Sequence, residues 1–197
     1  MNKRIAILGS TGSIGCNALE VIQHLGDPYR AIALSGNRNV EKLIEQTKKY
    51  RPAAIAVADE SLAEQLKHLD AQIYVGPGGL SEMVCRDDVD IVLAAIVGAA
   101  GLQPTLAAVR AGKQLALANK ESLVVAGSLV IPEARKCGTQ ILPVDSEHSA
   151  IFQAMQSGKL SEVKRVILTA SGGPFRCCSS EEIERATLAD ALNHPTW

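Results

Sequence analysis

Short apolar runs alternate with longer amphipathic segments up to Pro143, and this alternation constrains the fold more than any other feature. The runs are rich in Val, Ile, Leu and Ala and do not alternate in polarity, which is typical of parallel strands buried on both faces. We expect strands at 4–8, 31–35, 53–58, 72–75, 90–94, 114–118 and 140–143. We expect helices at 13–25, 40–49, 61–69, 80–85, 102–111 and 121–136. The pattern predicts an α/β fold with a doubly wound, mostly parallel, Rossmann-like sheet.

The character of the chain changes near Val144. Beyond it we expect a short helix at 149–156, one long apolar strand at 163–170, and then a glycine-rich turn and a polar tail. This stretch holds little apolar material outside the one strand. The sequence therefore predicts a Rossmann-like domain over residues 1–144 and the incomplete beginning of an α+β domain over 145–197.

Composition excludes several classes of function. The net charge is −1 and aromatic residues make up 3%, which argues against a basic nucleic-acid binder and a base-stacking surface. No apolar run reaches the roughly 18–20 residues of a membrane span, and no signal peptide is recognisable. The five cysteines have no metal-binding spacing and are interpreted as reduced thiols. We expect a cytoplasmic protein that binds neither nucleic acid nor membrane.

A glycine-rich turn follows the first expected strand and opens the first expected helix. Its sequence, Gly9-Ser-Thr-Gly-Ser-Ile-Gly15, has the spacing G-x-x-G-x-x-G rather than the usual G-x-G-x-x-G. Glycines there let the backbone approach a pyrophosphate, and the helix N-terminus offers unpaired N–H groups and a positive dipole end. An ordinary tight turn is the alternative, but three regularly spaced glycines at the first turn favour a dinucleotide site.

The second expected strand ends without the acid that usually holds the ribose 2′-hydroxyl of NAD. Gly36-Asn37-Arg38-Asn39 stands there instead. Arg38 is suited to bidentate pairing with a 2′-phosphate, which favours NADP(H) over NAD(H). A solvated loop arginine is the alternative.

Two polar segments follow the strands expected at 114–118 and 140–143, at the sheet edge where such folds bind ligands. One is Asn119-Lys120-Glu121-Ser122, and the other is Asp145-Ser146-Glu147-His148. If the backbone of the second is extended, Asp145 and Glu147 project to one side and offer hard oxygen ligands to Mg²⁺ or Mn²⁺. Asp145 as a simple helix cap is the alternative.

Three further segments are candidates for ligand contacts. The small-residue stretch 94–101 follows a buried strand and suits either close passage of a ribose or nicotinamide or tight backbone packing. Ser171-Gly-Gly-Pro174 offers a hydroxyl and backbone N–H groups to an anion, or is only a turn. His194-Pro-Thr-Trp197 is a candidate substrate-facing loop, or a plain chain terminus.

Taken together, six motifs in one order resemble the 1-deoxy-D-xylulose 5-phosphate reductoisomerase family over essentially the whole chain. They are Gly9–Gly15, 94–101, 118–123, 142–148, 171–175 and 194–197. The resemblance implies an enzyme that rearranges deoxyxylulose phosphate to an aldehyde and reduces it with NADPH to 2-C-methyl-D-erythritol 4-phosphate. It further implies a need for Mg²⁺ or Mn²⁺ and a place in non-mevalonate isoprenoid biosynthesis.

The resemblance also implies roles for individual residues. For NADPH these are Thr11, Gly12, Ser13 and Ile14 at the pyrophosphate, Asn37, Arg38 and Asn39 at the 2′-phosphate end, and Asn119 and Glu121 elsewhere on the cofactor. For the metal they are Asp145 and Glu147. For the phosphorylated sugar they are Lys120, Ser146, Ser171 and, on a flap, His194. Many relatives have glycine at the position of Asn37.

The family's chains are about twice as long as this one and form homodimers. They continue into a third metal carboxylate, further substrate ligands and a helical domain. We therefore expect this sequence to be an N-terminal fragment that ends in the flap and binds NADPH with little or no turnover, because a metal site needs its full ligand set.

Two alternative functions remain from the residues themselves. Semialdehyde dehydrogenases share this type of glycine loop, but they need a catalytic cysteine near a histidine, which is not recognisable here. A non-catalytic nucleotide-binding module would use Asp145 and Glu147 only as caps, and would show no metal affinity that rises with a substrate analogue.

Overall fold

The computed structural model describes residues 3–168 and 173–193. The chain divides into two compact units, Met1–Ser149 and Ala150–Trp197, each treated below by itself. Within the two described ranges, no helix combines the length and the apolar character needed to cross a membrane.

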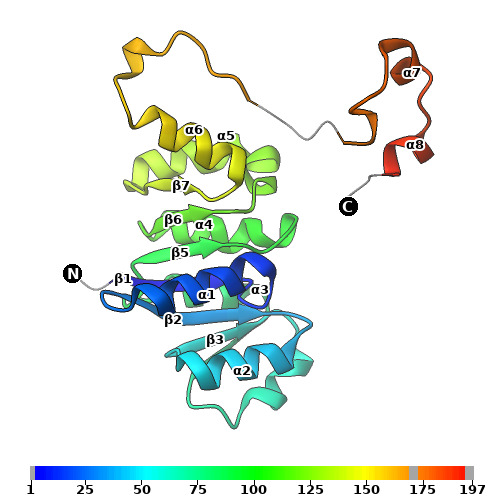
Figure 1. The fold of residues 1–197 in the computed structure, drawn as a ribbon. Coiled ribbons are helices and arrows are strands. Elements are labelled where there is room, and N and C mark those ends of the chain that lie inside the picture. The colour runs from blue at the N-terminus through cyan, green and yellow to red at the C-terminus, as the bar shows by residue number, and fades with distance from the viewer. Residues whose placement is uncertain (1–2, 169–172, 194–197) are drawn as a thin grey trace. The chain divides into compact units, whose positions relative to one another are not determined.

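The first unit is built on a seven-stranded sheet in which every neighbouring pair of strands is parallel (Figure 1). The strand order is β4-β3-β2-β1-β5-β6-β7. The strands are β1 (Lys3–Leu8), β2 (Tyr29–Gly36), β3 (Ala54–Val57), β4 (Gln72–Val75), β5 (Ile91–Ala94), β6 (Gln114–Leu117) and β7 (Ile141–Pro143). The prediction of a doubly wound parallel sheet is confirmed. The order reverses at β1, so ligands are expected above the carboxyl ends of β1 and β5.

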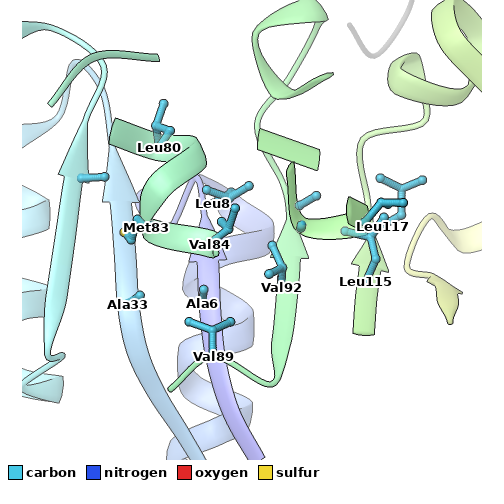
Figure 2. Packing of buried hydrophobic residues seen from close by; sticks show 14 of the residues in the cluster. Ala6, Leu8, Ala33, Leu80, Met83, Val84, Val89, Val92, Leu115 and Leu117 are labelled. Atoms are coloured by element: carbon cyan, nitrogen blue, oxygen red, sulfur yellow. The ribbon is translucent and has the colours of Figure 1, made fainter. Parts of the chain in front are cut away.

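Helices cover both faces of this sheet and divide the core in two. One face packs on α1 (Ser13–Leu25), α2 (Val40–Tyr50) and the 3₁₀ segment η1 (Glu60–Leu66), through Leu19, Leu43 and Leu66. The other packs on α3 (Gly76–Val84), α4 (Leu102–Arg110) and α5 (Glu121–Cys137), which bury Met83, Val109 and Val130. Figure 2 shows Leu80, Met83 and Val84 of α3 lying over strand residues of the second face. Burial on both faces explains the continuous apolar runs.

Three helices differ from their expected bounds by more than one residue at an end. The segment expected at 61–69 forms a 3₁₀ helix instead, where Oδ1 of Asp59 accepts from the N–H of Ser61 at 2.9 Å. Helix α3 starts four residues early, at Gly76. Gly76 has φ of +76°, which glycine tolerates, and Pro77 suits the first turn of a helix. Helix α6 (Ser146–Met155) starts three residues early, directly after Asp145. Helix ends depend on such local contacts, which the spacing of apolar residues in the sequence does not reveal.

Over 150–168 and 173–193, the second unit holds the greater part of α6 and further short turns and helices, with no strand. The further elements are η3 (Leu160–Glu162), η4 (Gly173–Phe175), α7 (Ser180–Glu184) and α8 (Leu188–Leu192). Capping boxes of Ser179 with Glu182 and Thr187 with Asp190 begin α7 and α8. The strand predicted at 163–170 is wrong for its described residues, 163–168, which are exposed and pair with no strand. An apolar run becomes a strand only where a neighbouring strand takes its backbone hydrogen bonds.

A buried polar network fixes the turn between β1 and α1. Oγ of Ser35, on β2, accepts from the N–H of Gly9 at 3.0 Å, and the carbonyl of Ser35 accepts from the N–H of Ser10 at 2.8 Å. The amide of Gln46, on α2, accepts from Oγ of Ser10 at 2.7 Å and donates to the Ser10 carbonyl at 2.8 Å. All three polar side chains are buried. The turn is therefore held to two neighbouring elements by satisfied hydrogen bonds.

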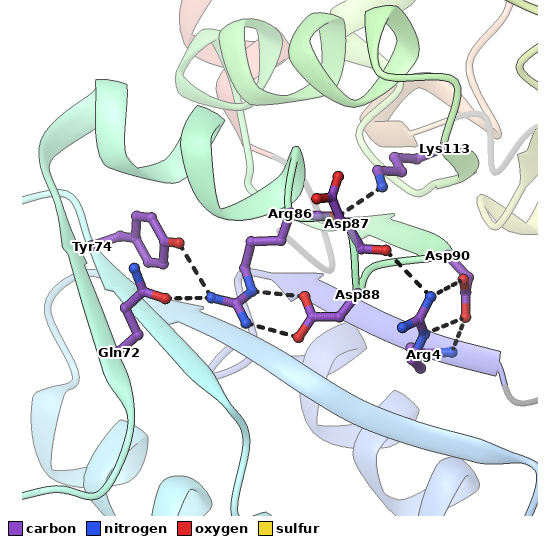
Figure 3. Close-up of polar contacts among 8 residues, drawn as sticks. All are labelled: Arg4, Gln72, Tyr74, Arg86, Asp87, Asp88, Asp90 and Lys113. Atoms are coloured by element: carbon purple, nitrogen blue, oxygen red, sulfur yellow. Dashed lines mark hydrogen bonds and ion pairs between the residues drawn. The ribbon is translucent and has the colours of Figure 1, made fainter.

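Charged pairs occupy the opposite, amino-terminal edge of the sheet (Figure 3). The Arg4 guanidinium donates to both oxygens of Asp90, at 3.0 and 2.9 Å, and so joins β1 to the start of β5. Arg86 pairs with Asp88 in the same two-pronged way, at 2.8 and 2.7 Å. The hydrogen bond from Arg4 is the largest cause that lowers the pKa of Asp90, to about 2. Asp90 thus stabilises the fold while it is ionised.

Replacement of Asp90 by Asn should lower the free energy of unfolding by about 1 kcal/mol near neutral pH, after allowance for solvent screening of a side chain that is 34% exposed. Because the folded-state pKa is depressed, this contribution is present above the unfolded-state value of about 3.9 and is lost as the pH falls through about 2. Urea unfolding at a series of pH values measures it. Asp87→Asn, at an exposed neighbour that uses only its carbonyl, is the control; a difference that persists undiminished in acid would contradict the assignment.

Replacement of Gln46 by Leu should lower the free energy of unfolding by about 1–3 kcal/mol, because Oγ and the carbonyl of Ser10 lose a buried partner. Gln65→Leu, at an exposed site on η1, makes the same chemical change and should shift stability by no more than about 0.5 kcal/mol. Denaturant melts of both variants provide the comparison. Equal effects would show that the network is not what fixes the turn.

Candidate functional site

A cavity of about 350 Å³ lies beyond the carboxyl ends of β1, β2 and β5, at the point where the strand order reverses. Three loops line it: the glycine turn after β1, the loop after β2, and the small-residue loop after β5. Ala58 and Leu80 complete the wall, and the lining residues are Gly9, Thr11, Gly12, Ser35, Gly36, Asn37, Arg38, Asn39, Ala58, Leu80, Ala95, Ile96, Val97 and Ala100. The cavity therefore joins three of the segments that the sequence singles out.

Glycine is required at two positions of the turn after β1. Gly9 has φ of +82°, and a Cβ there would lie 2.8 Å from the carbonyl oxygen of Ala95. A Cβ on Gly15 would lie 2.5 Å from Cα of Ser10, so α1 packs directly against the turn. Thr11 and Gly12 line the cavity, while Ser13 and Ile14 form the exposed first turn of α1. An anion at this point would meet free N–H groups and the positive end of the helix.

The loop after β2 carries polar side chains into the same cavity. Asn37, Arg38 and Asn39 all line it, and all three are exposed. Oδ1 of Asn39 accepts from the N–H of Lys42 at 3.0 Å and so caps α2. Arg38 has no ion pair with any residue of 3–168 or 173–193. A guanidinium that no carboxylate of the described chain neutralises suits a phosphate ligand.

Asn119 holds the loop after β5 to the start of α5. Its amide nitrogen donates to the carbonyls of Ile96 and Gly98, the second at 3.0 Å. Its amide oxygen accepts from the N–H and Oγ of Ser122, at 2.8 and 2.7 Å. Asn119 is only 3% exposed, and a Cβ on Gly101 would lie 2.8 Å from its Nδ2. The direct cofactor contact predicted for Asn119 stays a prediction, and the structure gives this amide a positioning role.

The second polar segment meets the first through an ion pair. Nζ of Lys120 lies 2.6 Å from Oδ2 of Asp145, and Nδ1 of His148 lies 3.0 Å from Oδ1 of the same carboxylate. The hydrogen bond from Lys120 is the largest cause that lowers the pKa of Asp145, and Asp145 in turn raises the pKa of Lys120. The Asp145 side chain is 14% exposed, against 58% for Lys120. A half-buried carboxylate is thus held ionised between two nitrogen groups.

The backbone after this carboxylate is helical rather than extended, which corrects one premise of the metal hypothesis. Asp145 precedes α6, its carbonyl accepts the N–H of Ser149 at 2.8 Å, and Ser146 and Glu147 lie exposed in the first helical turn. A helix rotates alternate residues away from one another, so period-two reasoning fails here. The described residues contain no group of three His, Cys, Asp or Glu side chains placed to hold a metal ion. Hard oxygens of Asp145 and Glu147 nevertheless suit Mg²⁺ or Mn²⁺.

A cavity of about 270 Å³ adjoins the ion pair. Its polar side chains are those of Lys120, Asp145 and His148, and the remaining wall is apolar: Leu117, Leu123, Val124, Ile141 and Pro143. Glu121, the first residue of α5, lies beside it in the chain but is not part of its lining. The carboxyl ends of β6 and β7 therefore present a small apolar hollow with charge at its rim.

Sequence reasoning missed several residues and two others cannot be placed. Ser171 and His194 lie outside the described residues. The sequence analysis does not identify the hydrogen-bond network of Ser35 and Gln46. The sequence feature that could reveal it is a glutamine on the buried face of α2, in register with Val40 and Leu43. His148 was quoted within its motif but given no role.

Comparison with known proteins gives the family. The model of 1-deoxy-D-xylulose 5-phosphate reductoisomerase matches residues 5–127, and the model of the C-terminal domain of the same enzyme matches residues 141–197. Reductoisomerases of this name from Phocaeicola vulgatus and Bacteroides fragilis are each 50% identical to the chain, of which they cover 100% and 99%. The chain spans about half the length of these curated relatives, 52% and 51%.

Solved structures agree in fold. The reductoisomerase of Zymomonas mobilis, in complex with NADPH, has a TM-score of 0.86 and 44% identity, over 99% of this chain and 52% of its own. A DOX-P reductoisomerase structure with NADPH, fosmidomycin and magnesium has a TM-score of 0.82 and 43% identity, over 99% and 52%. Two family models that together take in most of the sequence leave the semialdehyde dehydrogenase interpretation without support. This chain belongs to the 1-deoxy-D-xylulose 5-phosphate reductoisomerase family.

Proposed function

We propose that this chain is part of an enzyme that converts 1-deoxy-D-xylulose 5-phosphate to 2-C-methyl-D-erythritol 4-phosphate, with NADPH as reductant and a divalent cation. That reaction belongs to non-mevalonate isoprenoid biosynthesis. The observation that carries the proposal is the cavity above β1, β2 and β5, where a glycine turn faces the same space as Arg38, which no carboxylate of the described residues neutralises. The family match and the NADPH bound in related structures support it.

NADPH would lie across the point where the strand order reverses. Its pyrophosphate would meet the turn and first helical residues Thr11, Gly12, Ser13 and Ile14, where N–H groups at the start of α1 have no acceptor within the helix. The 2′-phosphate would meet Arg38, flanked by Asn37 and Asn39. Asn119 and Glu121 would contact another part of the cofactor, and Asn119 also holds the carbonyls of Ile96 and Gly98 in the loop after β5.

A divalent cation would be held by Asp145 and Glu147. When bound, such an ion supplies Lewis-acid polarisation of substrate oxygens. Lys120 would offset negative charge on the substrate, and Ser146 would offer it a hydroxyl from the exposed start of α6. We also propose that Ser171 contacts the substrate phosphate and that His194 lies over the substrate. The family resemblance supports these two roles.

We further propose that the 197-residue chain binds NADPH with little or no turnover. Across the described ranges, Asp145 and Glu147 are not joined by a third ligand, and Lys120 already engages Asp145. A homodimeric, cytoplasmic enzyme is proposed for the whole protein on the family resemblance.

Replacement of Arg38 by Met should weaken NADPH binding about tenfold to a hundredfold, because a charge-assisted contact with the 2′-phosphate is lost. NADH affinity should not change. Titration of both cofactors, followed by nicotinamide fluorescence, measures this. Arg30→Met, at an exposed position near the start of β2, the strand that leads to the Arg38 loop, is the matched control. Equal losses for the two cofactors would remove Arg38 as the phosphate reader.

The unaltered chain should raise nicotinamide fluorescence on binding NADPH, yet leave NADPH absorbance nearly constant when Mg²⁺ and 1-deoxy-D-xylulose 5-phosphate are added. The physical reason is that residues 3–168 and 173–193 supply no third ligand beside Asp145 and Glu147. Rapid NADPH consumption by the purified chain would contradict the second half of this prediction. Failure to bind either nicotinamide would contradict the first.

A further inference from the structure

Both oxygens of the Asp145 carboxylate already have partners. Lys120 donates to Oδ2 at 2.6 Å, and His148 meets Oδ1 at 3.0 Å. The carboxylate is mostly buried, whereas the lysine that neutralises it is mostly exposed. A metal ion on Oδ2 would lie close to the ammonium of Lys120, and repulsion between the two positive groups would favour departure of the lysine.

The negative charge around Lys120 lets its ammonium occupy the place of a divalent metal ion. Besides Asp145, the carboxylates of Glu121 and Glu147 act on its ammonium electrostatically and favour its charged form. An ammonium is a compact, strongly hydrated point charge on a flexible stem, so it can serve as a counter-ion without fixed geometry. Glu147, the second proposed metal ligand, therefore contributes to the field that holds Lys120.

We propose that Lys120 is the resident counter-ion of Asp145, and that a divalent cation displaces its ammonium, so that Lys120 becomes free for an anionic substrate only after the metal has bound. The inference rests on the proposed function, since it takes Asp145 as a metal ligand. It adds an order of events. The ammonium of Lys120 first keeps the Asp145 carboxylate ionised and in place, and its displacement by the metal then couples metal binding to substrate binding.

The surroundings allow this displacement at small cost. Lys120 is 58% exposed and precedes α5, so its stem can turn without disturbing the core. The adjoining cavity of about 270 Å³ offers space beside Asp145. Asp145 would keep His148 on its other oxygen and so retain its position. Repulsion between the ammonium and a divalent ion would drive the lysine outward.

The first test is Mn²⁺ affinity, measured from the electron paramagnetic resonance signal of free Mn²⁺. Lys120→Met removes the competing charge, and should tighten Mn²⁺ binding about two- to fivefold, the range expected for one partly exposed ion pair. Lys120→Arg should restore the weaker affinity of the unaltered chain. Lys136→Met, in the last turn of the same helix and 3.9 Å from Glu133, is the matched control and should change nothing.

The second test separates displacement from a general effect of charge. Lys120 should react faster with acetic anhydride as Mg²⁺ is added, while Lys136 should not, as read by mass spectrometry of the labelled peptides. Constant Lys120 reactivity, or unchanged Mn²⁺ affinity in Lys120→Met, would overturn the inference. Mn²⁺ binding that Asp145→Asn leaves intact would overturn both the inference and the metal assignment. Asp145-dependent binding with no effect of Lys120 would leave the metal assignment standing.

Discussion

The fold around the ligand cavity depends on how the turn after β1 is closed. This turn has few side chains of its own, and so its shape is set by hydrogen bonds from outside it: Ser35 on β2 and Gln46 on α2 hold Gly9 and Ser10. Because these bonds are buried, breaking one leaves an unsatisfied polar group rather than a hydrated one. The strand order then brings the turn beside the loop after β5, and the absence of a Cβ at Gly9 lets the two backbones approach.

The carboxyl edge of the sheet carries two cavities, and residues 119–120 contact a loop or side chain at each of them. Asn119 holds the carbonyls of Ile96 and Gly98 in the loop after β5, and the next residue, Lys120, reaches Asp145 after β7. Two consecutive residues after β6 therefore contact the loops of the strands on either side. A parallel sheet makes this possible, since every strand delivers its C-terminal loop to the same edge. The loop after β5 and the ion pair at Asp145 are thus linked through two consecutive residues of the backbone.

Sequence predicts the parts of this structure that depend on local pattern. The seven parallel strands and α1 follow from apolar runs and the glycine turn, which are properties of neighbouring residues. The strand expected at 163–170 fails over its described part because pairing is not local: an apolar run needs a partner strand. The geometry of Asp145 and Glu147 was missed since the helix starts earlier than its apolar pattern. Gln46 escaped notice because its partner lies 36 residues away.

Arginines at the two edges of the sheet show why a residue's type does not decide its role. Arg4 and Arg86 each donate two hydrogen bonds to a carboxylate, which neutralises their charge at the amino edge of the sheet. Arg38, at the carboxyl edge, faces a cavity and has no carboxylate partner in the described chain. A paired guanidinium has little left to offer a ligand, whereas an unpaired one keeps its full attraction for an anion. Placement relative to Asp and Glu, which only the fold reveals, separates Arg4 and Arg86, which stabilise the fold, from Arg38, for which we propose a phosphate ligand.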